Sequence, residues 1–431
     1  MTRMKELSQL MKTLEDQLVV CMKCGMCQAV CPLFAETGRE ADVARGKLAL
    51  LDGLMVQMFD DPEGVHQRLN KCLLCGSCAA NCPSGVNVLE IFIKARAILA
   101  GFQGLSPAKK AIFRGMLAHP ELFDRLGEWG AKFQKVFTKP ANEVIGTSCA
   151  RFMSPLIGER HFRPLAAVPF HKRISSLDTR PGASGLKVAF YVGCLADKIF
   201  PDLAQATVDV LTHHGVGIFM PENQACCGIP AVSGGDTDTF KRLVRRNIRL
   251  FQGGRYDCLV TACATCTSTI REVWPMMTAS DQELHAGARR IAEKTFDISQ
   301  FLVDRVGLKA SADSNGDIPV TYHDPCHLKK SLKVWNEPRA LINASRGYRL
   351  KEMPESDWCC GMGGSFNIQY YGISGRIGDR KRDNIRATGC RIVATGCPAC
   401  MLQISDTLSR AGDAVQVKHP VELYAESLKT K

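Results

Sequence analysis

The sequence has no long apolar run. Among its 431 residues, no uninterrupted apolar stretch reaches the roughly 18 residues that a membrane-spanning helix needs. The first ten residues carry Arg3, Lys5 and Glu6 and no long apolar core, so they do not have the pattern of a secretory signal. We therefore expect a cytoplasmic protein, and leave open a peripheral position on the inner face of the cytoplasmic membrane.

Fingerprints for nucleotide cofactors are also missing. No G-x-G-x-x-G motif follows a predicted strand, and there is no P-loop. The glycine-rich stretch Gly361-Met-Gly-Gly-Ser365 directly follows two cysteines, which indicates backbone room beside those cysteines rather than a phosphate site. We expect no flavin on this chain.

Acidic residues are fewer than basic ones, 43 against 55, and the formal net charge is +12. The basic residues are interpreted as scattered solvated side chains, with no nucleic-acid partner. A basic surface that faces an acidic partner or lipid headgroups is the alternative.

Cysteine is abundant, in contrast. The 21 cysteines are an odd number in a long chain without a secretory signal. A disulfide scaffold is typical of short secreted chains, so this pattern indicates metal ligation in a reducing compartment.

Cysteines with the spacing C-x2-C-x2-C-x3-C-P occur twice in the first hundred residues. This is the two-cluster ferredoxin run, in which three thiolates wrap one cluster and the fourth, next to proline, ligates the other. We predict one [4Fe–4S] cluster on Cys21, Cys24, Cys27 and Cys82, and a second on Cys72, Cys75, Cys78 and Cys31. The alternatives are zinc or unligated thiols, but zinc sites use two pairs of ligands rather than two matched runs of four.

The segments around the two runs have helical periodicity. Glu40–Met58 places Val43, Leu48 and Leu51 on one face, and Val88–Leu99 again has the pattern of a helix. We predict a helical ferredoxin-like domain over residues 1–100. A helical and extended linker follows over residues 101–185. Its helical part is predicted to bury four apolar residues, Ile112, Met116, Leu122 and Leu126.

The second half of the sequence is a duplication. Cys194 and Cys326 lie 132 residues apart, and Cys266 and Cys400 lie 134 apart. A repeat of this size predicts two homologous lobes, over residues 186–310 and 311–431. The first lobe contains Cys194, Cys226, Cys227, Cys263 and Cys266, and the second contains Cys326, Cys359, Cys360, Cys397 and Cys400.

Strands and helices alternate within each lobe, which predicts parallel α/β units. The cysteines follow strand ends or the turns that carry Cys-Cys-Gly, where α/β folds place ligands. We therefore predict a metal or cluster site in each lobe. Buried structural thiols in one lobe are the alternative, and a structural zinc is a further one. The predicted fold class is α + α/β, a helical two-cluster ferredoxin domain followed by a duplicated α/β Cys-Cys-Gly domain.

Three polar residues surround Cys326, namely His323, Asp324 and His327. We interpret them as support for the cysteine loop. Movement of protons coupled to cluster reduction is the alternative.

Two ferredoxin runs followed by two Cys-Cys-Gly lobes resemble the iron–sulfur subunits of glycolate oxidase, respiratory D-lactate dehydrogenases and anaerobic glycerol-3-phosphate dehydrogenase. The lobes also resemble the heterodisulfide reductase subunit that contains Cys-Cys-Gly domains. The resemblance covers most of the chain, from about Cys21 to Leu423.

This resemblance implies an electron-transfer subunit of an oxidoreductase complex with an acceptor other than NAD. A partner flavoprotein would oxidise a 2-hydroxy acid, glycolate or D-lactate, and electrons would pass through this chain toward a quinone or another carrier. The implied cofactors are two [4Fe–4S] clusters, and one or two further clusters or a zinc in the lobes. The catalytic residues, the choice among glycolate, lactate, glycerol-3-phosphate and disulfide, and the stoichiometry stay open.

One departure keeps a second function open. The last cysteine pair of each lobe is often incomplete in glycolate oxidase subunits, whereas Cys263/Cys266 and Cys397/Cys400 are both complete here. Complete five-cysteine sets in the heterodisulfide reductase subunit hold noncubane clusters. The alternative is therefore a catalytic subunit that acts on a disulfide or another sulfur substrate.

Overall fold

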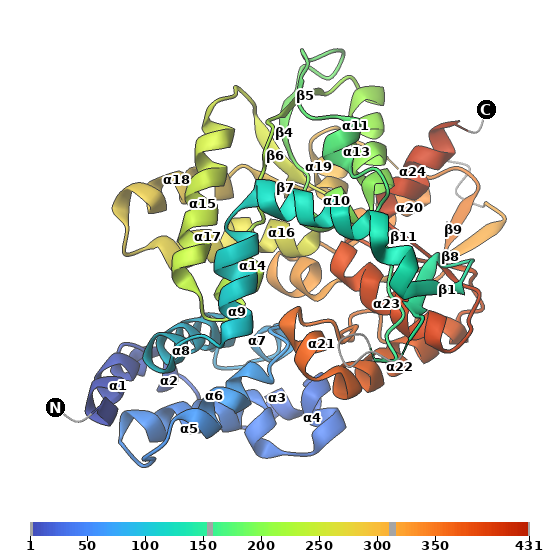
Figure 1. Cartoon of the computed structure of the whole chain (residues 1–431). Helices are drawn as coiled ribbons and strands as arrows, with labels where there is room; N and C mark the ends of the chain where they lie inside the picture. The colour runs from blue at the N-terminus through green and yellow to red at the C-terminus, as the bar shows by residue number, and fades with distance from the viewer. Residues whose placement is uncertain (1–2, 153–157, 310–315, 430–431) are drawn as a thin grey trace. The chain divides into compact units, whose positions relative to one another are not determined.

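The computed structural model describes residues 3–152, 158–309 and 316–429 (Figure 1). The chain divides into two compact units, each built from three separate stretches of sequence. Unit 1 comprises Met1–Ala118, Gly228–Arg242 and Gly361–Ile377. Unit 2 comprises His119–Cys227, Leu243–Cys360 and Gly378–Lys431.

Unit 1 is helical, and its described residues contain no β-strand. Its helices are α1 (Arg3–Lys12), α2 (Glu15–Leu18), α3 (Met26–Ala29), α4 (Pro32–Thr37), η1 (Glu40–Asp42), α5 (Ala44–Met55), α6 (Glu63–Asn70), α7 (Ser77–Ala80), α8 (Val88–Gln103), α9 (Pro107–Lys110), η2 (Ala111–Leu117), α14 (Ile229–Ser233) and α21 (Ser365–Gln369). The predicted helices over Glu40–Met58 and Val88–Leu99 appear as α5 and α8, and Val43, Leu48 and Leu51 are buried.

The two later segments of unit 1 begin directly after a Cys-Cys pair. In the segment that starts at Gly228, the Ser233 carbonyl accepts a hydrogen bond from Arg96 of α8 at 3.0 Å. Gly235 has φ +92°, and a Cβ there would collide with Ala100 and with the backbone of α8, so this close packing requires glycine. In the segment that starts at Gly361, a Cβ on Gly363 would lie 3.1 Å from the Cα of Leu73.

Unit 2 contains two larger sheets, and four strands of each follow the same order. The first has the order β3-β5-β4-β6-β7 and the second β9-β8-β10-β11. All neighbouring strands are parallel except β3, which is antiparallel to β5. The strands are β3 (Leu177–Asp178), β4 (Lys187–Tyr191), β5 (Gly217–Met220), β6 (Cys258–Thr261), β7 (Thr295–Asp297), β8 (Ile318–His323), β9 (Tyr348–Leu350), β10 (Ile392–Thr395) and β11 (Gln416–Lys418). The shared order β5-β4-β6-β7 and β9-β8-β10-β11 agrees with the predicted duplication.

Helices connect the parallel strands, as βαβ units require. The helices of unit 2 are α10 (Pro120–Phe137), α11 (Phe170–Arg173), α12 (Cys194–Lys198), α13 (Pro201–His213), α15 (Thr237–Gln252), α16 (Ala264–Ser268), η3 (Thr269–Val273), α17 (Trp274–Thr278), α18 (Gln282–Ala292), α19 (Ile298–Asp304), η4 (His327–Ser331), α20 (Asn336–Ala344), α22 (Tyr371–Ala387), α23 (Pro398–Arg410) and α24 (Pro420–Lys429). Of these, α10 and α11 precede the parallel strands and α24 follows them. The first turns of α15 and α22 belong to unit 1. The central strands are buried on both faces, which explains their continuous apolar sequences.

The predicted burial of the linker helix is wrong. Ile112, Leu122 and Leu126 are exposed by 47, 44 and 47 %, and Met116 is only partly buried. Helical spacing correctly predicts that the apolar residues of α10 share one side of the helix. The polar side of α10 faces the protein, however, and the apolar side does not. After α10 comes an antiparallel hairpin of β1 (Thr138–Asn142) and β2 (Thr147–Ala150), where the sequence predicts only extended chain. None of the helices in the described ranges is long and apolar enough to cross a membrane.

Candidate iron–sulfur sites

Each ferredoxin run folds into a loop that leads into a single helical turn. Gly25 and Gly76 precede α3 and α7 with φ values of +87° and +72°, a conformation that favours glycine. Cys31 caps the N-terminus of α4, where its sulfur accepts the Phe34 N–H at 3.4 Å. The two runs therefore share the same local geometry.

The structure brings Cys31 of the first run to the second run. Burial, together with smaller contributions from the neighbouring Cys75 and Cys72, raises the pKa of the Cys31 thiol to about 12. Burial likewise raises the pKa of Cys78, with added contributions from Cys72, Cys75 and Cys31. Such thiols become thiolates when a metal cation compensates their charge, so this group fits a cluster.

Two buried cations lie beside this group, and the sequence pattern gave no sign of them. Lys47 of α5 is 1 % exposed and donates to the Asp42 carbonyl. Burial lowers its pKa, and the nearby Cys72 and Cys31 oppose that change. Arg96 of α8 is 3 % exposed and donates to the Cys72 carbonyl at 2.7 Å. Positive charge at this place stabilises the thiolates that a cluster needs.

In the first lobe, the five cysteines come from three adjacent places. Cys194 begins α12 after β4, Cys226 and Cys227 precede α14, and Cys263 and Cys266 flank the start of α16 after β6. The Cys194 and Cys226 sulfurs lie 4.0 Å apart. The Cys266 thiol hydrogen-bonds with Cys227 and Cys263, which together with burial raises its pKa well above its usual value.

The second lobe repeats this arrangement. The Cys360 and Cys400 sulfurs lie 3.5 Å apart, and Cys400 also hydrogen-bonds with Cys397. These hydrogen bonds, together with burial, raise the pKa of Cys400 well above its usual value. His323 adds a buried imidazole whose nitrogen lies within 4.8 Å of the Cys360 and Cys400 sulfurs.

These distances fit metal ligation. Two thiolates on one tetrahedral metal lie about 3.8 Å apart, given metal–sulfur bonds of roughly 2.3 Å. The observed separations of 4.0 and 3.5 Å are on either side of this value, and none of these described cysteines is in a disulfide. A metal centre would remove the cost of placing several thiols in a buried space.

The two five-cysteine sets meet, which the sequence does not predict. The thiols of Cys263 and Cys397 hydrogen-bond with one another. The Ala264 N–H donates to the Gly396 carbonyl at 3.0 Å, and the Thr265 hydroxyl lies 3.3 Å from the Cys397 sulfur. The equivalent cysteine loops of the two lobes therefore pack directly against each other.

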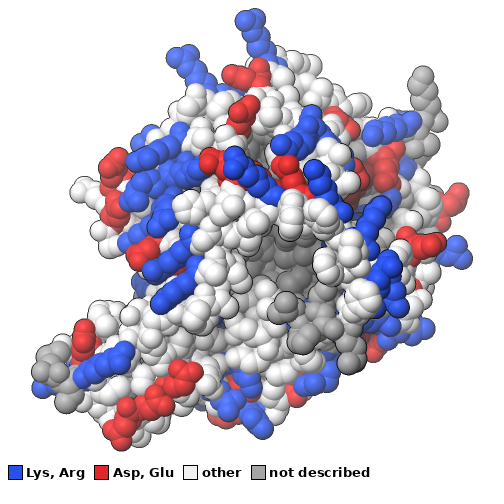
Figure 2. All heavy atoms as spheres, in the orientation of Figure 1, with Lys and Arg blue, Asp and Glu red and all other residues white. Residues whose placement is uncertain are grey.

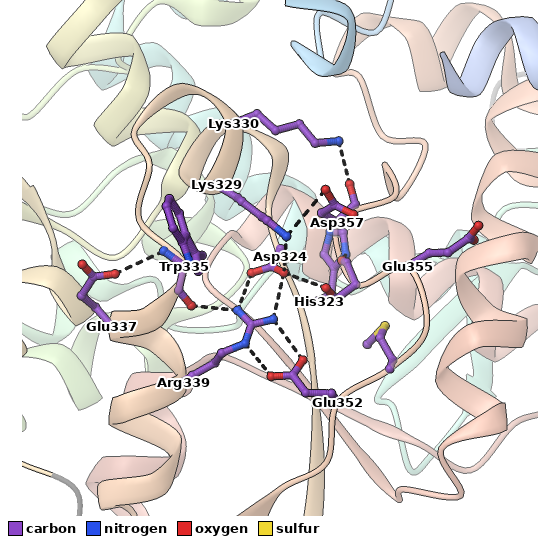
Figure 3. Close-up of polar contacts among 12 residues, drawn as sticks. His323, Asp324, Lys329, Lys330, Trp335, Glu337, Arg339, Glu352, Glu355 and Asp357 are labelled. Atoms are coloured by element: carbon purple, nitrogen blue, oxygen red, sulfur yellow. Dashed lines mark hydrogen bonds and ion pairs between the residues drawn. The ribbon is translucent and has the colours of Figure 1, made fainter. Parts of the chain in front are cut away.

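A buried ion-pair network supports the cysteine loops of the second lobe (Figure 3). Asp324 is 1 % exposed, and its carboxylate accepts hydrogen bonds from Arg339 at 2.7 and 2.9 Å and from Ser356 at 2.8 Å. Although burial acts in the opposite direction, Arg339 holds the pKa of Asp324 below its usual value. The predicted support role fits Asp324. His327 lies instead at the lobe contact, 3.2 Å from the Thr265 hydroxyl.

Lys381 is a further residue that the sequence analysis missed. It is 1 % exposed and donates to the Glu355 and Ser356 carbonyls. Ser356 lies three residues before Cys359 in the sequence. Burial lowers the pKa of Lys381 to about 8, against the effect of nearby Cys360. Its position within a basic helix gave no sign of this inward orientation.

Comparisons with known proteins agree with this geometry. A 4Fe-4S dicluster domain family matches residues 17–86, and a cysteine-rich domain family matches residues 188–271 and 320–405. A dicluster domain followed by two cysteine-rich domains defines the class of multi-cluster iron–sulfur proteins.

Comparison with individual relatives identifies the family within this class. The chain is 29 % identical to the probable glycolate oxidase iron-sulfur subunit of Bacillus subtilis, over 99 % of both chains. It is 30 % identical to lactate utilization protein A 2 of Bacillus cereus, over 56 % of this chain and 99 % of that protein. It is 29 % identical to a fumarate reductase (CoM/CoB) subunit of Methanothermobacter marburgensis, over 94 % of this chain and 71 % of that protein. The chain belongs to the family of glycolate oxidase and lactate utilization iron–sulfur proteins.

Proposed function

We propose that the chain is the iron–sulfur electron-transfer subunit of a flavin-dependent 2-hydroxy-acid dehydrogenase that acts on glycolate or D-lactate. A separate flavoprotein subunit would oxidise the substrate, and a quinone or another carrier would accept the electrons. The names of the Bacillus relatives support this proposal, as does the lack of a nucleotide fingerprint in the sequence.

The proposed cofactors are two [4Fe–4S] clusters in unit 1 and one or two further centres in the lobes. In unit 1 the ligand sets are crossed, which means that each cluster takes three cysteines of one run and the last cysteine of the other. When bound, such clusters supply one-electron carriers. Residues 1–100 would form the two-cluster domain, 101–185 the linker, and 186–310 and 311–431 the two lobes. Lys47 and Arg96 would offset the negative charge of the cluster at Cys72.

The observation that carries the proposal is the contact of the two five-cysteine sets at Cys263 and Cys397. A series of thiols runs from Cys194 in the first lobe through this contact to Cys360 in the second. Centres held on both sides of this contact would be near enough to exchange electrons, which supports an electron-transfer role.

The test is oxidation of glycolate and D-lactate by the purified chain, reconstituted anaerobically with iron and sulfide. We expect no substrate oxidation by the chain alone, and dye or quinone reduction only after addition of the flavoprotein that copurifies with the tagged chain. A Cys75→Ser variant should bind that flavoprotein equally well and transfer electrons at least tenfold more slowly. Oxidation of either acid by the chain alone would contradict the proposal.

A second candidate is reduction of a disulfide or another sulfur substrate at the lobe centres. Both cysteine sets are complete, and the relative from Methanothermobacter marburgensis carries CoM and CoB, which are thiols, in its name. This function predicts that the EPR spectrum of the loaded chain changes when a thiol or disulfide is added. An unchanged spectrum would count against it.

A further inference from the structure

His323 is a buried histidine in which one ring nitrogen is hydrogen-bonded and the other has no hydrogen-bond partner among the described residues. It ends β8 and is 1 % exposed. Its Nδ1 lies 3.1 Å from the Ser356 carbonyl. Because a carbonyl only accepts, Nδ1 carries the hydrogen and Nε2 has the free lone pair. Nε2 has no hydrogen-bond partner among the described residues.

This free nitrogen lies beside two thiols. A nitrogen of His323 and the sulfurs of Cys360 and Cys400 lie within 4.8 Å of one another, and the two sulfurs are 3.5 Å apart. Metal-ligating histidines typically donate their other N–H to a carbonyl or carboxylate, which fixes the tautomer. The bond to Ser356 fulfils this condition.

At the equivalent position of the first lobe, the structure has a tyrosine in place of the histidine. Tyr191 ends β4 and pairs with Thr261, just as His323 ends β8 and pairs with Thr395. The Tyr191 hydroxyl donates to the Ala225 carbonyl at 2.6 Å, so it is already committed. The two lobes therefore differ at equivalent strand positions.

We propose that Nε2 of His323 is a nitrogen ligand of the metal centre in the second lobe, together with Cys360 and Cys400. This inference rests on the proposed iron–sulfur centre of that lobe and adds an asymmetry between the lobes. Replacing a thiolate by neutral imidazole reduces the negative charge at a centre and raises its reduction potential. The electron would then reside on the second-lobe centre in preference to the first-lobe centre.

The test uses the full chain loaded with 57Fe and labelled with either 14N- or 15N-histidine. We expect pulsed EPR to detect a histidine nitrogen coupling that changes with the label. Mössbauer spectra, which detect every iron whatever its spin state, should contain an iron site that is altered in His323→Ala. The ferredoxin-run signals should stay unchanged, which separates this result from failure of the proposed electron-transfer function.

A matched control is His419→Gln. His419 is equally buried, but its Nδ1 accepts the Val421 N–H at 3.2 Å, so its hydrogen is on Nε2 and it offers no ligand. This variant should keep the nitrogen coupling and the Mössbauer spectrum. The proposal is overturned if the wild-type spectra are insensitive to the histidine label and His323→Ala has the wild-type Mössbauer spectrum.

A second feature, independent of the cysteines, is the outward apolar face of α10. Six large apolar residues are exposed by 44 to 65 %, and they are Leu122, Leu126, Trp129, Phe133, Val136 and Phe137. Phe152 continues this face, since the Arg151 N–H donates to the Phe137 carbonyl at 2.9 Å and Phe152 is 66 % exposed. Figure 2 has a largely uncharged band over α10, with charged side chains along its border.

The charges of α10 are distributed unequally. Each of its acidic residues is paired, Glu121 with Arg246, Asp124 with Lys198 and Glu128 with Lys172. Its exposed basic residues have no ion pair in the described part of the chain, and they are Arg125, Lys132 and Lys135. An apolar face with Trp and Phe, next to unpaired basic residues, is typical of helices that lie in a membrane interface.

We infer that α10 binds the surface of an anionic lipid membrane, with Trp129 and Phe133 inserted among the lipids and the basic residues at the headgroups. This inference goes beyond the proposed function, because it adds a lipid contact and assigns that contact to one helix. A protein partner with an apolar surface is an outcome that the test distinguishes.

The test is cosedimentation of the cluster-loaded chain with vesicles of phosphatidylcholine, with and without phosphatidylglycerol. We expect binding to the anionic vesicles that weakens with salt, and at least a tenfold loss in Trp129→Glu/Phe133→Glu. The control Val56→Glu/Met58→Glu changes residues that are equally exposed, by 63 and 73 %, and should bind like wild type. Trp129→Phe should bind but lose the fluorescence blue shift.

Absence of vesicle binding by the wild type overturns the inference. So does a result in which Trp129→Glu/Phe133→Glu leaves vesicle binding intact and instead abolishes a homodimer or the complex with the flavoprotein. The assay contains no substrate, so its outcome is separate from that of the electron-transfer experiment.

Discussion

Replacement of Cys31 by Ser is expected to damage the cluster of the second cysteine run and to leave that of the first run intact. The structure places Cys31 in a buried group with Cys72, Cys75 and Cys78, although it lies 41 residues before the first of them. A cluster that loses one of four thiolates typically loses iron or becomes labile. We expect Cys31→Ser to lose about one to four iron atoms per chain, measured by iron analysis and EPR.

Paired substitutions make this prediction sharper. Cys31→Ser/Cys75→Ser should lose no more iron than Cys75→Ser alone, because both ligands serve one cluster and their effects are not additive. Cys82→Ser/Cys75→Ser should lose both clusters. Cys149→Ser, which changes a partly buried cysteine outside all of the sets, should keep all of its iron. Equal loss in the two double variants would contradict the crossed assignment.

Arg339→Met is expected to be the most destabilising single change in the second lobe. It removes the main partner of Asp324, and the remaining contacts are Ser356 at 2.8 Å and Lys329 at 3.5 Å. Breaking a buried ion pair on one side costs about 3–5 kcal/mol, because it leaves an uncompensated buried charge. Anaerobic thermal denaturation of the loaded chain should reveal the loss.

The pH dependence of this effect follows from the lowered pKa of Asp324. A carboxyl whose pKa is lower in the folded state contributes stability above its unfolded pKa of about 3.9, and that contribution is lost as the pH falls through the folded pKa. The difference between wild type and Arg339→Met should therefore be largest near pH 7 and shrink below about pH 4. The control Arg289→Met breaks an exposed pair with Glu293 and should cost less than about 0.5 kcal/mol. A difference that is independent of pH would contradict this account.

Local patterns predict those parts of the molecule that local physics determines. The strands that precede Cys194, Cys263, Cys326 and Cys397 are mostly apolar, and each is present in a parallel sheet as a strand that is buried over most of its length. Gly25 and Gly76 mark turns with positive φ because few other residues adopt that conformation.

Long-range packing is what the sequence patterns did not predict. The spacing of Leu122 and Leu126 predicts a helix, but periodicity does not say whether an apolar stripe faces the protein or the solvent. The repeat predicts two sets of cysteines, but the contact at Cys263 and Cys397 depends on how two folded lobes pack. Lys47 and Lys381 are buried by residues distant in the sequence, and a single lysine in a helix carries no sign of this.

The composition of unit 1 has a consequence for dissecting the protein. Its segments from Gly228 and from Gly361 are encoded far downstream of residue 118, within the cysteine-rich repeats. A gene fragment that ends at residue 118 would yield a ferredoxin-like polypeptide in which Arg96 lacks the Ser233 carbonyl and Leu73 lacks the segment around Gly363. Conversely, a fragment that carries only the repeats would present those two segments with nothing to pack on. Unit 1 therefore needs the downstream part of the gene to complete its core.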